Sequence, residues 1–278
     1  MKILVTGHKG YIGSHLYSEI KKDLTHEVYG IDLKDGDDVL HCLPDEQFDI
    51  VFHFCAYPRV EYSVINPSYT LQQNVLVTSK LLEWSKNHGV KKFIFSSSSA
   101  IMGDGDGVPK SPYGLHKLMS EMECKLYKEL YGVHCVCLRY FNAYSEDQPY
   151  GGAYTTAISA WMEMIRQNKP LRLDGDGEQT RDFVHVEDIV SANILAMNND
   201  DMHDDYYNVG YGSSFSLNYI KDFIDRHQKV EWDFAPPRKG DARNTLANNQ
   251  SLIDCGWKPK VHFDKGLNRC FSLCGTTE

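Results

Sequence analysis

The chain has 278 residues, of which 42% are hydrophobic, and its formal net charge is −9 at pH 7. This composition is sufficient for a full hydrophobic core, and the acidic balance argues against a nucleic-acid-binding protein, which needs a basic surface for phosphates. The sequence shows no signal peptide and no apolar run near the roughly 18 residues that span a bilayer, so we expect a cytoplasmic protein without a membrane segment.

Short apolar runs alternate with longer amphipathic segments through the first half of the chain. In chain order we expect strand Lys2–Val5, helix Gly13–Lys22, strand Glu27–Ile31, strand Ile50–Phe54, helix Pro67–Asn87, strand Phe93–Phe95, helix Pro112–Tyr131 and strand Val133–Tyr140. Strands that alternate with helices predict a parallel sheet covered by helices on both faces. The expected fold class is therefore α/β, a Rossmann-type doubly wound parallel sheet.

The alternation ends at about Asn142, where glycine and proline become frequent and the expected elements shorten. We expect a dinucleotide-binding domain at residues 1–143 and a smaller C-terminal substrate-binding lobe at residues 144–278. The chain is expected to return to the first domain at about 182–211, through Asp182–Asn198 and Tyr207–Val209.

Eight cysteines are scattered along the chain, and no C-x-x-C pair has a matching second pair. Several of them lie within apolar runs. We therefore expect buried thiols in a reducing compartment and no metal site.

A glycine turn follows the first expected strand. Gly7, Gly10 and Gly13 form the pattern G-x-x-G-x-x-G, and Tyr11 and Ile12 lie between the last two glycines. Glycine at these positions permits a tight turn and lets backbone N–H groups approach a pyrophosphate at the N-terminus of the following helix. The turn therefore predicts a dinucleotide site, with these five residues at the pyrophosphate.

Asp32 ends the second expected strand and indicates which dinucleotide is bound. A carboxylate at this point accepts hydrogen bonds from the adenine-ribose hydroxyls and repels a 2′-phosphate. Lys34 is the nearby residue that favours NADP instead. The following segment is too short for a full strand–helix unit, so Asp38 and Val39 are expected to bring a short strand to the adenine. The predicted cofactor is NAD, with Leu33 also beside its adenosine.

Tyr113 and Lys117 are spaced i, i+4 at the start of an expected helix, so both side chains lie on one face. A neighbouring ammonium lowers the pKa of a phenol from its usual value near 10, which suits a phenolate general base. The serines Ser96–Ser99 follow an expected strand, at a sheet edge that faces the ligand crevice, where the Ser98 hydroxyl can bind the reacting oxygen. Each pattern alone fits a solvated helix face or a polar turn, but together they predict a catalytic set of Ser98, Tyr113 and Lys117.

These motifs resemble the extended short-chain dehydrogenase/reductase family, which includes the sugar-nucleotide epimerases and dehydratases. The resemblance covers nearly the whole chain. Further matching segments are His53-Phe-Cys-Ala56, Asn66-Pro67, Asn74, Arg139-Tyr-Phe-Asn142, Gly175-Asp-Gly177, Arg181-Asp-Phe-Val-His-Val186, Arg238-Lys-Gly-Asp241 and Gly256-Trp-Lys-Pro259. The chain departs from the family pattern at Met102, where a Tyr is usual, and at Cys55, where Ala is common.

The resemblance implies further site residues and an assembly. It implies cofactor contacts at Phe54, Cys55, Ala56, Asn74, Ser96 and Tyr140, in addition to Tyr113 and Lys117. It implies substrate contacts at Ser98, Asn142, Arg181, Arg238 and Asp241, and guanidinium groups suit the diphosphate of a nucleotide sugar. The helices Pro67–Asn87 and Pro112–Tyr131 resemble those that form a four-helix contact in the family, so a homodimer is expected.

The resemblance also narrows the reaction. Dehydratases of the family carry Asp-Glu after the serine, and the equivalent positions here are Ser99 and Ala100, so elimination lacks its acid/base pair. An epimerase needs only the Ser–Tyr–Lys set: the tyrosine takes the hydroxyl proton, hydride passes to NAD, and hydride returns to the other face of a 4-keto sugar. The expected activity is that of a UDP-hexose 4-epimerase. The alternatives are an NAD(P)-dependent keto-sugar reductase, and, more remotely, a dehydratase or a non-catalytic NAD-sensing module.

Overall fold

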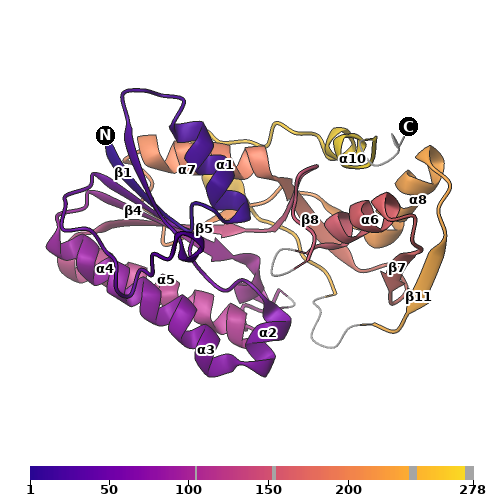
Figure 1. The fold of residues 1–278 in the computed structure, drawn as a ribbon, viewed down its shortest axis with the longest axis horizontal. Helices are drawn as coiled ribbons and strands as arrows, with labels where there is room; N and C mark the ends of the chain where they lie inside the picture. Colours follow the sequence, from indigo (N-terminus) through magenta and orange to yellow (C-terminus); the bar gives the residue numbers. More distant parts are fainter. Residues whose placement is uncertain (104, 152–154, 238–242, 273–278) are drawn as a thin grey trace.

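A six-stranded parallel sheet forms the centre of the first part of the molecule (Figure 1). The structure is a computed structural model and describes residues 1–103, 105–151, 155–237 and 243–272. The strand order is β2-β1-β3-β4-β5-β9, with bounds β1 (Lys2–Thr6), β2 (Glu27–Ile31), β3 (Ile50–His53), β4 (Lys92–Ser98), β5 (His134–Tyr140) and β9 (Tyr207–Val209). The order reverses between β1 and β3, and the crevice outside such a switch point is where ligands bind in doubly wound sheets.

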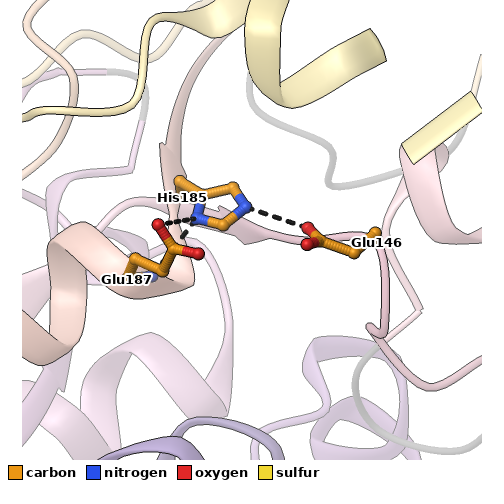
Figure 2. A group of neighbouring side chains, drawn as sticks. All are labelled: Glu146, His185 and Glu187. Atoms are coloured by element: carbon orange, nitrogen blue, oxygen red, sulfur yellow. Dashed lines mark hydrogen bonds and ion pairs between the residues drawn. The ribbon is translucent and has the colours of Figure 1, made fainter. Parts of the chain in front are cut away.

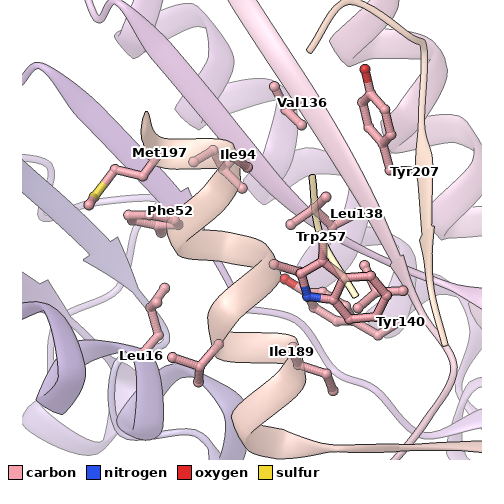
Figure 3. Close-up of a cluster of buried hydrophobic side chains, with 14 of the residues drawn as sticks. Leu16, Phe52, Ile94, Val136, Leu138, Tyr140, Ile189, Met197, Tyr207 and Trp257 are labelled. Carbon is pink, nitrogen blue, oxygen red and sulfur yellow. The ribbon is translucent and has the colours of Figure 1, made fainter. Parts of the chain in front are cut away.

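Two layers of helices cover the sheet because alternate strand residues point to opposite faces. Ile3 and Val5 of β1 face α1 (Tyr11–Ile20) and α7 (Val186–Asn198), and Figure 3 shows the core between α7 and the strands. Leu4 faces α4 (Val77–Asn87) and α5 (Pro112–Tyr131) on the other side. The predicted α/β fold with helices on both faces is confirmed.

The segment predicted as one helix at Pro67–Asn87 contains a change of hydrogen-bond register. It comprises α3 (Pro67–Leu71), a π-helical turn η2 (Gln72–Leu76) and then α4. A π turn adds one residue to a helical turn and often marks a functional position. Here it contains Asn74, which is buried.

The helix α5 has the predicted bounds because both of its ends carry clear signals. Ser111 caps its N-terminus by accepting the Gly114 N–H at 3.2 Å, and Pro112 occupies its first turn. Gly132 ends it with a positive φ of 70°. Two further short helices, α2 (Val60–Ile65) and α3, pack against α5.

The second lobe has its own core around Tyr144, Trp161 and Phe183. A three-stranded sheet contains β6 (Asn142–Tyr144), β8 (Thr180–His185) and β10 (Ser214–Ser216), and β7 (Leu171–Asp174) pairs with β11 (Trp232–Ala235). The helices of this lobe are α6 (Ala157–Arg166), α8 (Leu217–His227) and α10 (Phe263–Ser272), whereas α9 (Gln250–Asp254) packs on β9. Within the described residues, no helix combines the length and apolarity needed to cross a lipid bilayer.

Two local expectations differ from the structure. The short strand expected at Asp38 and Val39 does not form, because the Asp38 carboxylate accepts the Leu40 N–H at 2.9 Å and closes a turn. The chain rejoins the first sheet at α7 and β9, later than Asp182, because β8 pairs with β6 and β10. The division into domains at residues 143 and 144 stays a prediction.

Candidate active site

The glycine turn between β1 and α1 has a backbone that excludes larger residues. Gly7 has a φ of +75°, and a Cβ on it would lie 2.6 Å from the backbone nitrogen of Cys55. A Cβ on Gly13 would lie 2.2 Å from the carbonyl oxygen of Gly7. Gly10 is the N-cap of α1. The turn therefore presents the N-terminal amides of a ten-residue helix at the switch point of the sheet, which fits the pyrophosphate of a dinucleotide.

Asp32 is nine-tenths buried beside this turn and connects it to the end of β2. Its carboxylate accepts the backbone N–H groups of Lys9 and Lys34, each at 2.9 Å. The Lys34 ammonium donates to the Lys9 carbonyl at 2.8 Å. The carboxylate thus lies between the glycine turn and the end of β2, with two lysines beside it, and its contact with an adenine ribose stays a prediction. Leu33 is exposed next to it, whereas the Val39 side chain points into the core.

We expect Asp32→Ala to narrow the preference for NAD over NADP, because the substitution removes the charge that repels a 2′-phosphate and leaves Lys9 and Lys34 in place. Calorimetric titration of both dinucleotides into the wild type and the variant measures the change. Asp37→Ala, at an exposed carboxylate of the same loop, is the control. Tighter binding of NADP than of NAD by the wild type would contradict the assignment.

The first turn of α5, which carries Tyr113, packs against the turn that follows Ser98 at the end of β4. The 3₁₀ turn η3 (Ser99–Met102) follows β4, and the half-buried Ser98 caps it by accepting the Ala100 N–H at 3.2 Å. Gly114, next to Tyr113, lies so near this turn that a Cβ on it would be 2.4 Å from the Ala100 carbonyl oxygen. The Tyr113 N–H donates to the Ser63 hydroxyl of α2 at 3.0 Å. The first turn of α5 is thereby fixed between α2 and η3.

Lys117 is almost fully buried one turn after Tyr113. Its ammonium donates to the Ser96 carbonyl oxygen at 2.6 Å and lies 4.7 Å from the centroid of the Phe95 ring. Burial lowers the pKa of Lys117 to about 8, an effect that the nearby Cys55 and Glu121 oppose. The structure therefore places a positive charge at the end of β4, on the helix that carries Tyr113.

The remaining predicted cofactor residues of the first domain lie at the ends of β3 and β5. Phe54, Cys55 and Ala56 follow β3 and are half-buried, and the Phe54 ring stacks on Tyr140 of β5 with centroids 6.4 Å apart. The Tyr140 hydroxyl donates to Asn193 at 2.9 Å, and burial raises the pKa of Tyr140 well above its usual value. Burial also raises the pKa of the Cys55 thiol to about 12, so it is protonated near neutral pH.

Asn74 uses its side-chain amide to hold the loop after β3. Its Oδ1 accepts the Tyr57 N–H at 2.6 Å, and its Nδ2 donates to the Tyr57 carbonyl at 3.2 Å. Asn74 therefore shapes the loop beside the cofactor site, and a direct contact of its side chain with the cofactor stays a prediction.

Two of the predicted substrate residues, Asn142 and Arg181, lie on the three-stranded sheet of the second lobe. Asn142 of β6 is paired in register with Phe183 of β8, and its amide donates to the Asp182 carbonyl at 3.0 Å. The guanidinium of Arg181 donates to the carbonyl oxygens of Thr180 and Arg243, at 2.9 Å and 3.2 Å. Ser98 lies on β4, and the last two predicted substrate residues, Arg238 and Asp241, lie outside the described residues.

Asp182, which the sequence analysis did not single out, organises this part of the site. Its fully buried carboxylate accepts the N–H groups of Tyr211 at 2.6 Å, Gly212 at 3.0 Å and Ala247 at 3.1 Å. Burial raises its pKa to about 6. The sequence signal that could have identified Asp182 is its position between Arg181 and Phe183, in a segment that matches a motif of the family.

The loop after β6 joins the two lobes through residues that the sequence analysis also missed. The Ser145 hydroxyl lies 2.6 Å from the Tyr11 hydroxyl and donates to Asp147 at 2.6 Å. Asp147 pairs with His15 of α1 at 3.1 Å, which lowers the pKa of Asp147 to about 2 and raises that of His15. The helix that follows the glycine turn is thus bound to the loop that begins at Ser145, directly after β6.

Glu146, His185 and Glu187 form the group of side chains with the donor types of a metal site (Figure 2). The Nε2 of His185 lies 3.2 Å from Glu146, and its Nδ1 lies 4.0 Å from Glu187. The Arg269 guanidinium contacts both carboxylates, at 2.6 Å for Glu146 and 2.5 Å for Glu187. Because the Arg269 guanidinium supplies a positive charge between the two carboxylates, these side chains form an ion-pair network in the structure, and the expectation of no metal site stays a prediction.

The fold and the site define a dinucleotide-binding enzyme of the Rossmann type with a Ser–Tyr–Lys set. A family model for the NAD dependent epimerase/dehydratase family matches residues 3–210. The chain belongs to this family. The sequence-based predictions of the family, of NAD as the cofactor and of a sugar-nucleotide epimerase activity are confirmed by the relatives that follow.

Related proteins that match nearly the full length of this chain support the same assignment. A putative UDP-glucose 4-epimerase of Methanocaldococcus jannaschii is 33% identical, covering 96% of each chain. The UDP-N-acetylglucosamine 4-epimerase of Methanobrevibacter ruminantium, solved with UDP-N-acetylmuramic acid, superposes with a TM-score of 0.89 at 29% identity, covering 98% of this chain and 97% of that one. The UDP-glucuronic acid 4-epimerase of Bacillus cereus, solved with UDP-glucuronic acid and NAD, superposes with a TM-score of 0.88. It is 27% identical, and the match covers 100% of both chains.

Proposed function

We propose that the chain is a UDP-sugar 4-epimerase that uses NAD. The observation that carries the proposal is the buried Lys117 ammonium, bound to the Ser96 carbonyl at the end of β4 and one turn after Tyr113. A phenol near an ammonium is suited to act as a general base, and the proposal assigns this role to Tyr113 with Lys117 as the stabilising charge. The names of the relatives support UDP as the nucleotide and carbon 4 as the reacting position.

In this mechanism each of the proposed site residues has a defined role. The Tyr113 phenolate takes the proton from the sugar 4-hydroxyl, Ser98 holds the same oxygen by a hydrogen bond, and the Lys117 charge stabilises the phenolate. When bound, NAD supplies the hydride acceptor at its nicotinamide. The Tyr113 hydroxyl then returns the proton to the 4-keto oxygen as the carbonyl is reduced from the other face. The reaction therefore ends without net oxidation, and Asn142 and Arg181 are proposed to hold the nucleotide diphosphate.

The experiment that tests the proposal incubates the purified protein with UDP-glucose, UDP-glucuronic acid, UDP-N-acetylglucosamine and dTDP-, GDP- and CDP-sugars, followed by NMR. We expect one UDP-sugar to be converted to its 4-epimer without consumption of reduced cofactor. Stoichiometric consumption of reduced cofactor would identify the keto-sugar reductase. A 4-keto-6-deoxy product would identify a dehydratase, which Ser99 and Ala100 argue against because they carry no carboxylate. Binding of NAD without turnover of any nucleotide sugar would indicate a non-catalytic NAD-sensing module.

A homodimer is the proposed assembly. Large apolar side chains on α2, α3, η2 and α5 are exposed on the single chain, with 72% of Ile65, 64% of Met122 and 62% of Leu130 accessible. Monomeric proteins rarely expose so many apolar side chains on one set of adjacent helices, and a two-fold contact would cover them.

We expect light scattering to give twice the chain mass of 31.8 kDa at micromolar concentration. Met122→Glu should shift the protein toward the monomer because it buries a charge in the proposed contact. Leu24→Glu, at an exposed apolar residue outside these helices, should not. A monomeric wild type at these concentrations would remove the dimer from the proposal.

A cytoplasmic location and the lack of a nucleic-acid partner also remain proposals. They are supported by the net charge of −9 and by the described cysteines, all of which are free thiols.

A further inference from the structure

A chain of buried polar groups joins the ends of β1 and β3 to α4, and the mechanism above does not use it. Thr6 ends β1, His53 ends β3, and Thr78 and Asn74 lie on α4 and η2; all four are buried. The Thr6 hydroxyl lies 3.0 Å from Nδ1 of His53, and the Thr78 hydroxyl lies 2.9 Å from its Nε2. The chain thus connects the start of the glycine turn to the π turn.

The proton positions along this chain follow from the acceptors. The Thr78 hydroxyl donates its single hydrogen to the backbone carbonyl oxygen of Asn74 at 2.6 Å. It therefore accepts a hydrogen from Nε2 of His53, which leaves Nδ1 as the acceptor for Thr6. Burial and the nearby Lys117 charge lower the pKa of His53 to about 3, so the ring is neutral at physiological pH. His53 is thus a fixed tautomer with both nitrogens occupied.

Two contacts lead from His53 to the catalytic helix. The His53 ring packs on Phe95 with centroids 5.6 Å apart, and the Lys117 ammonium lies 4.7 Å from the centroid of that same Phe95 ring. On the other side, the π turn that Thr78 and Asn74 hold packs directly against α5. His53 therefore supports both Phe95, which lies beneath the ammonium, and the turn that faces the catalytic helix.

We propose that His53 is a positioning residue that acts through Thr78 and Phe95 to hold Lys117 in its working place. The inference rests on the proposed function, since it assigns a role with respect to Lys117. Displacement of a catalytic group by a fraction of an ångström is sufficient to cost turnover without loss of the fold. The nucleotide sugar is held by the second lobe in this proposal, so its affinity should not depend on His53.

The test compares His53→Leu, His53→Gln and Thr78→Val with the control Thr70→Val. Thr70 is equally buried, but its hydroxyl bonds only to the nearby Asn66 and Pro67 carbonyls of its own helix among the contacts described. We expect His53→Leu and Thr78→Val to lower kcat about 10–100-fold, with KM within about twofold. Glutamine places a donor where Nε2 lies, so His53→Gln should recover most of kcat. Thr70→Val should retain the wild-type kcat.

Two measurements do not depend on turnover. NMR of the His53 ring nitrogens should show the proton on Nε2 between about pH 5 and pH 8, and NAD affinity should fall in Thr78→Val but not in Thr70→Val. A proton on Nδ1 of His53 would overturn the proposal. So would a Thr78→Val variant that is less stable than the wild type but has the same kcat and NAD affinity, because His53 would then have a purely structural role. If the wild type converts no nucleotide sugar, the proposed function fails, and these two measurements still decide the role of His53.

Discussion

Tyr113→Phe is expected to lower turnover by about 10²–10⁴-fold, because it removes the only oxygen of the side chain and keeps the ring. The affinity for the nucleotide sugar should stay within a few-fold, since Asn142 and Arg181 lie on the other lobe. Single-turnover and steady-state rates on the true substrate measure the loss. Tyr131→Phe, at an exposed tyrosine of the same helix, is the control. Near-normal turnover of Tyr113→Phe would refute the mechanism while leaving the fold intact.

The pH dependence of turnover separates Tyr113 from Lys117. Activity should fall on the acid side as the phenolate becomes protonated, and this limb should vanish in Tyr113→Phe. It should also fall above about pH 8, because the buried Lys117 ammonium loses its proton there and with it the charge that stabilises the phenolate. In Lys117→Met the acid limb should move to higher pH, toward the ordinary tyrosine pKa near 10.

The parts of the fold that the sequence predicts are those whose signals are local. The bounds of β2 and α5 agree with the expected residues because an apolar run defines the first, and Ser111, Pro112 and Gly132 define the ends of the second. The proposed catalytic pair could be located from the sequence for the same reason, because Tyr113 and Lys117 are one turn apart on α5, whose bounds the sequence predicts.

The π turn shows why other features of the structure could not be predicted from the sequence. Its residues keep the apolar spacing of a helix, and a register shift of one hydrogen bond leaves no mark in that spacing. Directly after the π turn, Thr78 of α4 contacts His53 of β3, and this tertiary contact leaves no mark in the local sequence. The contacts of Ser145 with Tyr11 and of Asp147 with His15 likewise join segments more than a hundred residues apart, so residue type alone could not pair them.

The pair formed by Glu121 and Arg139 is a second feature of this kind, and it predicts the largest effect on stability. The Arg139 guanidinium binds the Glu121 carboxylate through two nitrogens, at 2.9 Å and 2.6 Å, and the Ser97 hydroxyl donates to the same carboxylate at 2.5 Å. The Tyr206 ring covers the guanidinium at 3.3 Å from its centroid. Both charged residues are more than nine-tenths buried, and they join α5 to β5. Their charges are therefore satisfied mainly by each other.

Arg139→Met should lower the free energy of unfolding by about 3–5 kcal/mol, since it leaves the Glu121 carboxylate buried without its partner. Glu121→Leu should lower the free energy of unfolding by a similar amount, because it leaves the Arg139 guanidinium buried without its partner. The double variant should recover much of the loss, because two apolar side chains remove both desolvation penalties at once. Urea unfolding of the four proteins measures the cycle. Lys125 lies on the same helix as Glu121 and forms an exposed pair with Asp205 of the loop before β9, so Lys125→Met should change stability little. If the double variant is as unstable as the sum of the single ones, the loss comes from packing of each side chain alone, and the pair does not act as a unit.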